Sequence, residues 1–463
     1  MDVGELLSFK PTPTPKRPNE DDSDDSEDDN VKSAKLRRLV KNRPDSITQM
    51  VRGLPKEPVI SDKEREDILR FVETEATQEL TDVDILHESE EGADELINAL
   101  AEAEAPALLL HNLARLDEQV PDERDAVHNS LGIVENITEF RPELSTEVAK
   151  QGFMQWILKR LKLKVPFDGN KLYATEILSI LLQNTPENRK LLGELDGIDV
   201  LLQQLAFYKR NDPSGAEEQE AMENMFDSLC CALMEPANRD RFLRGEGLQL
   251  MNLMLREKKM SRNGSLKVLD HALAGPEGKD NCNKFVEILG LRTVFPLFMK
   301  TPKRKRLLTV DQHEEHVVSI IASMLRNCQG GQRQRLLAKF TENDLEKVDR
   351  LLELHFKFMD KVDRTEKEME QEGEELDDDA QYLRRLSGGL FTLQLIDRII
   401  LEVCTAGPSG VKQRVQRVLS LRGCSLKIIR HVMREYAGNL GDAGSEEWRQ
   451  QEQQHILQLV DKF

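Results

Sequence analysis

Aromatic residues are scarce in this chain of 463 residues: they make up 5% of the sequence, with 2 Trp and 4 Tyr. Alternating runs of β-branched residues are also rare beside Leu, Glu, Lys, Arg and Ala, which favour helices. This composition excludes an all-β sandwich. We therefore predict an all-α fold.

Cysteines and long apolar runs are equally scarce. The six cysteines, at positions 230, 231, 282, 328, 404 and 424, form no CxxC pair and no framework spacing, which is typical of a reducing compartment, cytosol or nucleus. The opening MDVGELLSFK lacks the basic and apolar regions of a secretory signal, and the apolar stretch 317–325 has only nine residues. We expect no signal peptide and no membrane-spanning helix.

Acidic residues outnumber basic ones, since 84 Asp and Glu oppose 65 Lys and Arg and give a net charge of −19 at pH 7. Generic nucleic-acid binding needs many cations to neutralise phosphates, so we expect no direct nucleic-acid binding and favour basic partners. The sequence contains no Gly-rich phosphate loop, GxSxG motif or paired Cys/His constellation. We therefore expect neither an enzyme nor a cofactor.

Residues 1–60 differ from the rest of the chain. Prolines precede the acidic block 20–29 and the basic stretch 32–43, and such blocks bury too little apolar surface to fold, so we predict a disordered tail. Its basic clusters are typical of a nuclear localisation signal, although a tail that only aids solubility has the same composition. Ser26 precedes three acidic residues and is a candidate phosphorylation site. The residues of the candidate signal are Lys16, Arg17, Lys35, Arg37 and Arg38.

The middle of the chain repeats one pattern: an apolar helix, a polar break, a helix of about ten residues, a glycine and another apolar helix. Gly152, Gly197, Gly247 and Gly290 mark the copies, in steps of 45, 50 and 43 residues. This period indicates a helical solenoid of two-helix HEAT or three-helix armadillo units. A glycine that tolerates positive φ and close backbone approach suits two short helices meeting at a steep angle, which favours the three-helix unit.

The pattern divides the chain into four parts. After the tail we predict armadillo-like repeats over 61–359, an acidic inserted loop over 360–381, and further helical repeats with a cap over 382–463. Weaker copies of the repeat extend upstream to 96–116 and downstream beyond the loop.

The segment TPENRKLLGELDGIDVLLQQL resembles an armadillo repeat, and longer strings such as VENITEFRPE, PFDGNKLYATEIL and RFLRGEGLQLMNLMLREKK resemble the beta-catenin-like family of nuclear armadillo proteins. The resemblance covers about residues 81–463 and the first eight residues. It implies a right-handed superhelix of three-helix repeats and a role in the spliceosome.

The same resemblance implies partners. Family members act in the Prp-nineteen/Cdc-five-like complex, bind the nuclear localisation segment of the Cdc-five-like splicing factor and, in vertebrates, bind activation-induced deaminase. We expect a non-enzymatic scaffold for mRNA splicing, with a nuclear transport adaptor as the alternative and an enzyme as a more distant one. The stretch before Thr81 is shorter than in the family, and an end that is incompletely capped leaves self-association open.

In armadillo repeats the third helices line the concave face, and import receptors place a Trp and an Asn there. Counting back from each glycine aligns the apolar residues Val134, Leu178, Leu229 and Leu269. The Asn position then falls on Asn136, Ile180, Cys231 and His271, and the Trp position on Gly132, Glu176, Asp227 and Lys267. The import-receptor ladder is therefore absent.

Carboxylates on or beside the third helices replace that ladder. A concave surface of one sign focuses its field on a Lys/Arg-rich segment, so we predict an acidic partner-binding groove. The alternative is that these residues are ordinary solvated helix faces. The predicted groove residues are Glu135, Asn136, Glu139, Glu176, Glu223, Asp227 and Asp270.

Three further motifs have two interpretations each. The basic run 303–306 either contacts RNA phosphate or is a solvated loop, and it lacks interleaved aromatics. His313 and His316 are three residues apart, whereas the zinc motif HExxH needs four, so we expect no metal site. The adjacent Cys230 and Cys231 lie in an apolar stretch, where core packing is expected.

Overall fold

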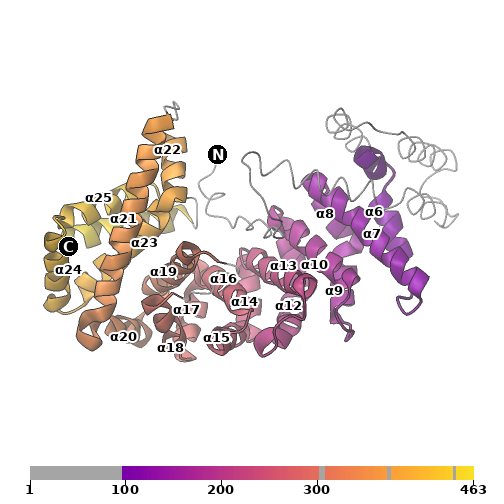
Figure 1. Ribbon diagram of the computed structural model, residues 1–463, viewed down its shortest axis with the longest axis horizontal. Helices are drawn as coiled ribbons and strands as arrows, with labels where there is room; N and C mark the ends of the chain where they lie inside the picture. The colour runs from indigo at the N-terminus through magenta and orange to yellow at the C-terminus, as the bar shows by residue number, and fades with distance from the viewer. Residues whose placement is uncertain (1–95, 302–307, 373–376, 442–444) are drawn as a thin grey trace, which may run out of the picture. The chain divides into compact units, whose positions relative to one another are not determined.

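The computed structural model describes residues 96–301, 308–372, 377–441 and 445–463. These residues form helices and connecting turns, without a β-strand in the described ranges, which confirms the all-α prediction (Figure 1). Within these ranges no helix has both the length and the apolar character needed to cross a membrane. The predicted tail 1–60 and the start of the predicted repeats lie outside the described residues.

The chain divides into two compact units. The described part of the N-terminal unit comprises residues 96–205 and 213–235, and it begins with helical residues 96–102. Its further helices are α6 Ala105–Leu113, α7 Pro121–Phe140, a 3-10 turn Pro142–Leu144, α8 Ser145–Val148, a π turn Ala149–Phe153, α9 Met154–Lys162, α10 Gly169–Gln183, α11 Pro186–Glu194, α12 Gly197–Leu205 and α13 Ala216–Ala232.

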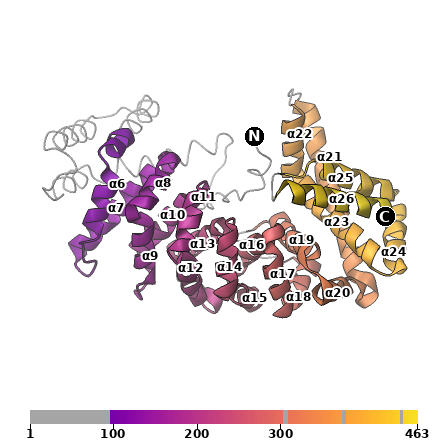
Figure 2. The same ribbon diagram turned by 180° about the vertical axis from the view of Figure 1, so that it is seen from behind.

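The C-terminal unit comprises residues 206–212 and the described residues from 236 onward. Short 3-10 turns occur at Ala206–Lys209, Pro276–Gly278, Lys339–Thr341 and Asn343–Leu345, and a π turn at Leu386–Leu390. Its helices are α14 Pro236–Arg244, α15 Gly247–Glu257, α16 Arg262–Leu273, α17 Lys279–Glu287, α18 Leu291–Met299, α19 Val310–Asn327, α20 Gly330–Ala338, α21 Glu346–Glu372, α22 Asp378–Arg385, α23 Phe391–Ala406, α24 Ser409–Leu421, α25 Leu426–Gly438 and α26 Glu446–Lys462 (Figure 2).

The predicted repeat is present as a short helix, a second short helix and a long third helix. In the copy around Gly197 these are α11, α12 and α13, and α11 begins with a proline, which suits the first turn because its missing N–H has no partner there. The apolar residues Val134, Leu178, Leu229 and Leu269 are all 0% exposed. These four residues are therefore core positions of the long helices α7, α10, α13 and α16.

The glycines between the first two helices act through close packing. A Cβ at Gly197, Gly247 or Gly290 would collide with the side chain five residues earlier, which is Leu192, Phe242 or Phe285. The sequence argument also assigned these glycines a positive φ, and that is wrong for all three. The left-handed residue is the preceding one, with φ of 57° at Asp196, 60° at Glu246 and 66° at Leu289. Only Gly152 of the four has positive φ itself, at 118°.

The acidic segment 360–381 is not a loop. Helix α21 continues to Glu372 and α22 begins at Asp378, so only 373–376 lie outside the described residues. Arginines of α22 stabilise this acidic helix, because Arg385 Nε lies 2.7 Å from Glu366 Oε1 and Arg384 pairs with Glu372. The prediction of an acidic inserted loop is therefore wrong for the described residues, which are mostly helical and whose carboxylates pair with arginines of α22.

Candidate partner-binding surface

Three long helices of the N-terminal unit, α7, α10 and α13, carry most of the predicted groove residues. Helix α10 packs against both α7 and α13, so the three lie side by side in chain order (Figure 1). Helix α10 starts sharply because the Asp168 carboxylate accepts a hydrogen bond of 2.8 Å from the backbone N–H of Lys171. The packing brings equivalent positions of successive repeats next to one another.

Glu135 is buried, so its prediction as a groove residue is wrong. Its side chain is only 6% exposed. The physical reason is helical spacing, because Leu131, Val134, Glu135 and Thr138 follow the i, i+3, i+4, i+7 pattern of one face, and that face is buried. A partner in solution does not reach this carboxylate.

Asn136 is the one asparagine at the position where import receptors carry theirs, and its side-chain amide bonds to the backbone of its own helix. Its Nδ2 donates a hydrogen bond of 2.6 Å to the carbonyl of Gly132. At the same position of the next two repeats, Ile180 is half-buried and Cys231 is buried. These side chains do not form a row of amide donors for a partner backbone.

Four of the predicted groove carboxylates are accessible in this unit, and we call them the acidic row: Glu139, Glu176, Glu223 and Asp227. Glu139 is exposed and the other three are half-buried. Glu176 and Asp227 occupy the same register on the adjoining helices α10 and α13, each two residues before the buried Leu178 or Leu229. Packing of α10 against α13 therefore places two carboxylates of the same register on neighbouring helices.

Asp270, the last predicted groove residue, lies on α16 in the C-terminal unit. His316 Nδ1 of α19 lies 2.9 Å from Asp270 Oδ2, and both side chains are 17% exposed. Asp270 therefore serves a contact between two neighbouring helices, which a sequence argument from repeat position does not reveal.

The two histidines of the HEEH motif face different surroundings. Burial and the nearby charge of Arg262 lower the pKa of His313 to about 4, so its imidazole is neutral at pH 7. His316 contacts Asp270 instead. Across the residues that the structure describes, no group of three or more His, Cys, Asp or Glu side chains is arranged to hold a metal ion.

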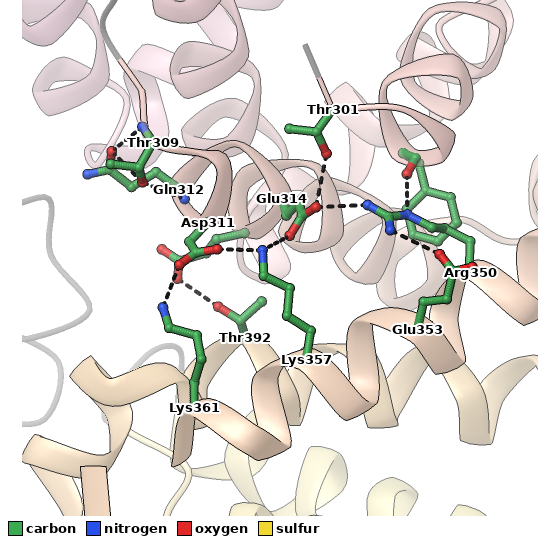
Figure 3. Close-up of polar contacts among 12 residues, drawn as sticks. Thr301, Thr309, Asp311, Gln312, Glu314, Arg350, Glu353, Lys357, Lys361 and Thr392 are labelled. Atoms are coloured by element: carbon green, nitrogen blue, oxygen red, sulfur yellow. Dashed lines mark hydrogen bonds and ion pairs between the residues drawn. The ribbon is translucent and has the colours of Figure 1, made fainter. Parts of the chain in front are cut away.

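Sequence reasoning missed a charged cluster between α19 and α21 (Figure 3). Lys357 Nζ lies 2.6 Å from Glu314 Oε2 and 2.5 Å from Asp311 Oδ1, and Lys361 Nζ lies 2.7 Å from Asp311 Oδ2. Arg350 Nη2 lies 2.8 Å from Glu314 Oε1. The partners are 36 to 50 residues apart in sequence, so only the folded chain brings them together.

The cluster favours the charged forms of Asp311 and Lys357. Burial by itself would raise the pKa of Asp311, but hydrogen bonds from Lys357 and Lys361 outweigh it and hold that pKa below the usual value. Burial likewise opposes the charge of Lys357, yet Asp311 and Glu314 raise its pKa. With Glu353, whose Oε2 lies 3.1 Å from Arg350 Nη1, three cations face three carboxylates, and their ion pairs join α19 to α21.

Several predicted sites lie outside the described residues: Lys16, Arg17, Ser26, Lys35, Arg37, Arg38 and the basic run 303–306. Cys230 and Cys231 are buried on α13, as core packing requires.

Comparison with known families decides the kind of protein. Residues 66–434 match the family described as catenin-beta-like, Arm-motif containing and nuclear. The chain belongs to the catenin-beta-like family. The Arm motifs of this family agree with the three-helix units of the structure. Membership of the family, together with the helical-repeat fold, points to a protein-binding scaffold rather than an enzyme.

Catenin-beta-like relatives match most of the chain. Beta-catenin-like protein 1 of Homo sapiens is 61% identical over 398 residues, covering 83% of this chain and 71% of the relative. The Beta-catenin-like protein 1 homolog of Schizosaccharomyces pombe is 30% identical over 369 residues, covering 78% of this chain and 64% of the relative. The crystal structure of an engineered protein matches with a TM-score of 0.50 and 13% identity, over 92% of this chain and 99% of that one, which is a likeness of fold.

Proposed function

We propose that this chain is a non-enzymatic scaffold of the spliceosome-associated Prp-nineteen/Cdc-five-like complex and supports pre-mRNA splicing by binding basic segments of partner proteins. The observation that carries the proposal is the acidic row on α7, α10 and α13. Two of its carboxylates, Glu176 and Asp227, hold the same position on adjoining helices, so an extended segment with repeated Lys or Arg residues would meet both of them.

The proposed partners are those that the resemblance implies. The Cdc-five-like splicing factor carries a nuclear localisation segment of the required charge, and activation-induced deaminase is the corresponding partner in vertebrates. The resemblance that the sequence strings show, and membership of a family described as nuclear, support this assignment.

Reversing two charges of the acidic row tests the proposal. In the variant Glu176→Lys/Asp227→Lys, we expect the full chain to bind a labelled Lys/Arg-rich peptide of nuclear-localisation type at least about tenfold more weakly at low salt, because two attractive charges become repulsive. Fluorescence anisotropy measures the affinity. The matched control is Glu187→Lys/Glu194→Lys, two exposed carboxylates on α11, which should change the affinity less than twofold. Equal affinity of the first variant and the unmodified chain would refute the assignment.

The same variant used as bait in nuclear extract distinguishes scaffold from transport adaptor. The unmodified chain is expected to recover splicing factors, and Glu176→Lys/Asp227→Lys to recover fewer of them. Recovery of nuclear-pore transport factors in their place would favour the adaptor.

The chain is also proposed to reach the nucleus through the basic clusters of its tail. Removal of residues 1–43 takes away Lys16, Arg17, Lys35, Arg37 and Arg38. We expect the shortened protein to lose most of its nuclear enrichment, because flexible basic segments are what import receptors bind. Fluorescence imaging of tagged chains measures this, and a shortened protein that stays wholly nuclear would count against the signal. Phosphorylation at Ser26 would add negative charge to this tail.

A further inference from the structure

The segment 409–438, which contains α24 and α25, has the opposite charge to the rest of the chain. It carries seven Lys and Arg residues and a single carboxylate, Glu435, although the whole chain has a net charge of −19. Glu435 does not neutralise its neighbours, since it accepts hydrogen bonds from Arg385 at the end of α22, with Nη2 to Oε2 at 3.3 Å.

Five of the seven cations form no ion pair within the described part of the chain. Arg414 is held by Asp349 of α21, with Nη2 2.7 Å from Oδ2, and Lys412 donates to the carbonyl of Lys462. The remaining cations are Arg417, Arg422, Lys427, Arg430 and Arg434. We call these five residues the basic stripe.

Helix α25 presents its share of the basic stripe on one side. Lys427, Arg430 and Arg434, with His431, follow the i, i+3, i+4, i+7 spacing of one helix face. The opposite face is buried through Ile429, Met433 and their apolar neighbours. Lys427, His431 and Arg434 are exposed and Arg430 is half-buried, so the cationic face points to solvent.

An exposed apolar side chain lies between two of these cations, Arg417 and Arg422, in the sequence. Leu421, the last residue of α24, is 77% exposed. Arg417 lies one helical turn before it on the same face, and Arg422 follows it directly, with its guanidinium carbon 5.2 Å from the Phe356 ring centre. Leu421 and the two arginines therefore offer an apolar contact and ionic contacts side by side along α24.

We propose that the basic stripe and Leu421 form a second docking surface, which binds an acidic peptide segment that carries an apolar side chain. A nucleic acid would use the cations but not Leu421, and base stacking needs exposed aromatic rings, whereas Phe356 is already covered by Arg422. The negative charge of the rest of the chain does not prevent binding, because salt screens charges beyond about 8 Å at physiological ionic strength.

A labelled synthetic peptide of alternating glutamate and alanine with one central leucine tests the proposal on the full chain. We expect Lys427→Glu/Arg434→Glu to weaken binding at least about tenfold in fluorescence anisotropy, since it reverses two exposed charges of the basic stripe. Leu421→Ser should reduce the affinity to that of a peptide whose leucine is replaced by serine. The matched control is Lys159→Glu/Lys162→Glu, two exposed lysines on α9, which should bind the peptide within twofold of the unmodified chain.

Two outcomes would overturn the proposal. The first is equal peptide affinity of the unmodified chain and Lys427→Glu/Arg434→Glu, with both shown to be folded by circular dichroism. The second is tighter binding of a single-stranded poly-uridine RNA than of the peptide, with insensitivity to Leu421→Ser, because that result would assign the surface to nucleic acid. Neither result bears on the acidic row, whose variants are tested with a basic peptide.

Discussion

Arg398→Ala is expected to lower the free energy of unfolding of the C-terminal unit by about 3–5 kcal/mol. Arg398 on α23 is 1% exposed and pairs with Glu452 of α26, and its Nη2 lies 3.8 Å from Glu402 Oε1. Its loss removes one of the two arginines that face each of Glu402 and Glu452, leaving Arg333 and Arg326, and it opens a cavity between α23 and α26. Urea denaturation followed by circular dichroism measures the change.

Two comparison variants separate the possible causes of that loss. Arg398→Met keeps most of the side-chain volume, so we expect a smaller loss than in Arg398→Ala, because it removes the charge without opening a cavity. Lys339→Ala removes an exposed pair with Glu342, at 2.8 Å, and should cost less than about 1 kcal/mol. A loss in Arg398→Ala no larger than in Lys339→Ala would contradict the assigned role of the buried arginine.

Asp397→Ala is expected to be equally damaging, and in a pH-dependent way. Asp397 of α23 lies 2.5 Å from His355 Nδ1 of α21, and both side chains are 0% exposed. Burial alone would lower the pKa of His355, but the Asp397 carboxylate outweighs it and raises that pKa. Burial in turn raises the pKa of Asp397, against the opposing effect of His355. We expect a loss of about 3–5 kcal/mol at pH 6, where the variant leaves a buried histidine without its partner.

The sign of the pH dependence follows from the raised pKa of His355. Its contribution is fully present below the unfolded value of 6.5 and is lost as the pH rises through the higher folded value. The difference in unfolding free energy between the unmodified chain and Asp397→Ala should therefore be larger at pH 6 than at pH 9. Urea denaturation at each pH measures this difference. A difference that stays constant from pH 6 to pH 9 would show that the pKa of His355 does not change on folding.

The repeats can be predicted because their apolar spacing is local in the sequence. The contacts between helices cannot, because they join residues that are far apart in the sequence. Val134, Leu178, Leu229 and Leu269 were found because apolar periodicity and a glycine lie within about twenty residues of each other. Glu135 was misplaced because its residue type was weighed above its spacing, which already put it on the buried face.

The missed features share one physical cause. The acidic helix α21 looked like a loop because its neutralising partners, Arg384 and Arg385, belong to another helix. The cluster of Asp311, Glu314 and Lys357 joins segments more than forty residues apart, and no local pattern encodes that contact. Ion pairs between helices become visible only once the helices are packed.

The burial of the thiols has a practical consequence. All six cysteines are free, and five of them are buried, so only Cys424 is partly open to solvent. Burial also raises the pKa of Cys328 to about 11 and of Cys404 to about 12, which keeps these groups in their unreactive protonated form. A maleimide dye should therefore label the natural chain at Cys424, which lies in the turn between α24 and α25. A fluorophore attached there would sense an approaching ligand without any engineered cysteine.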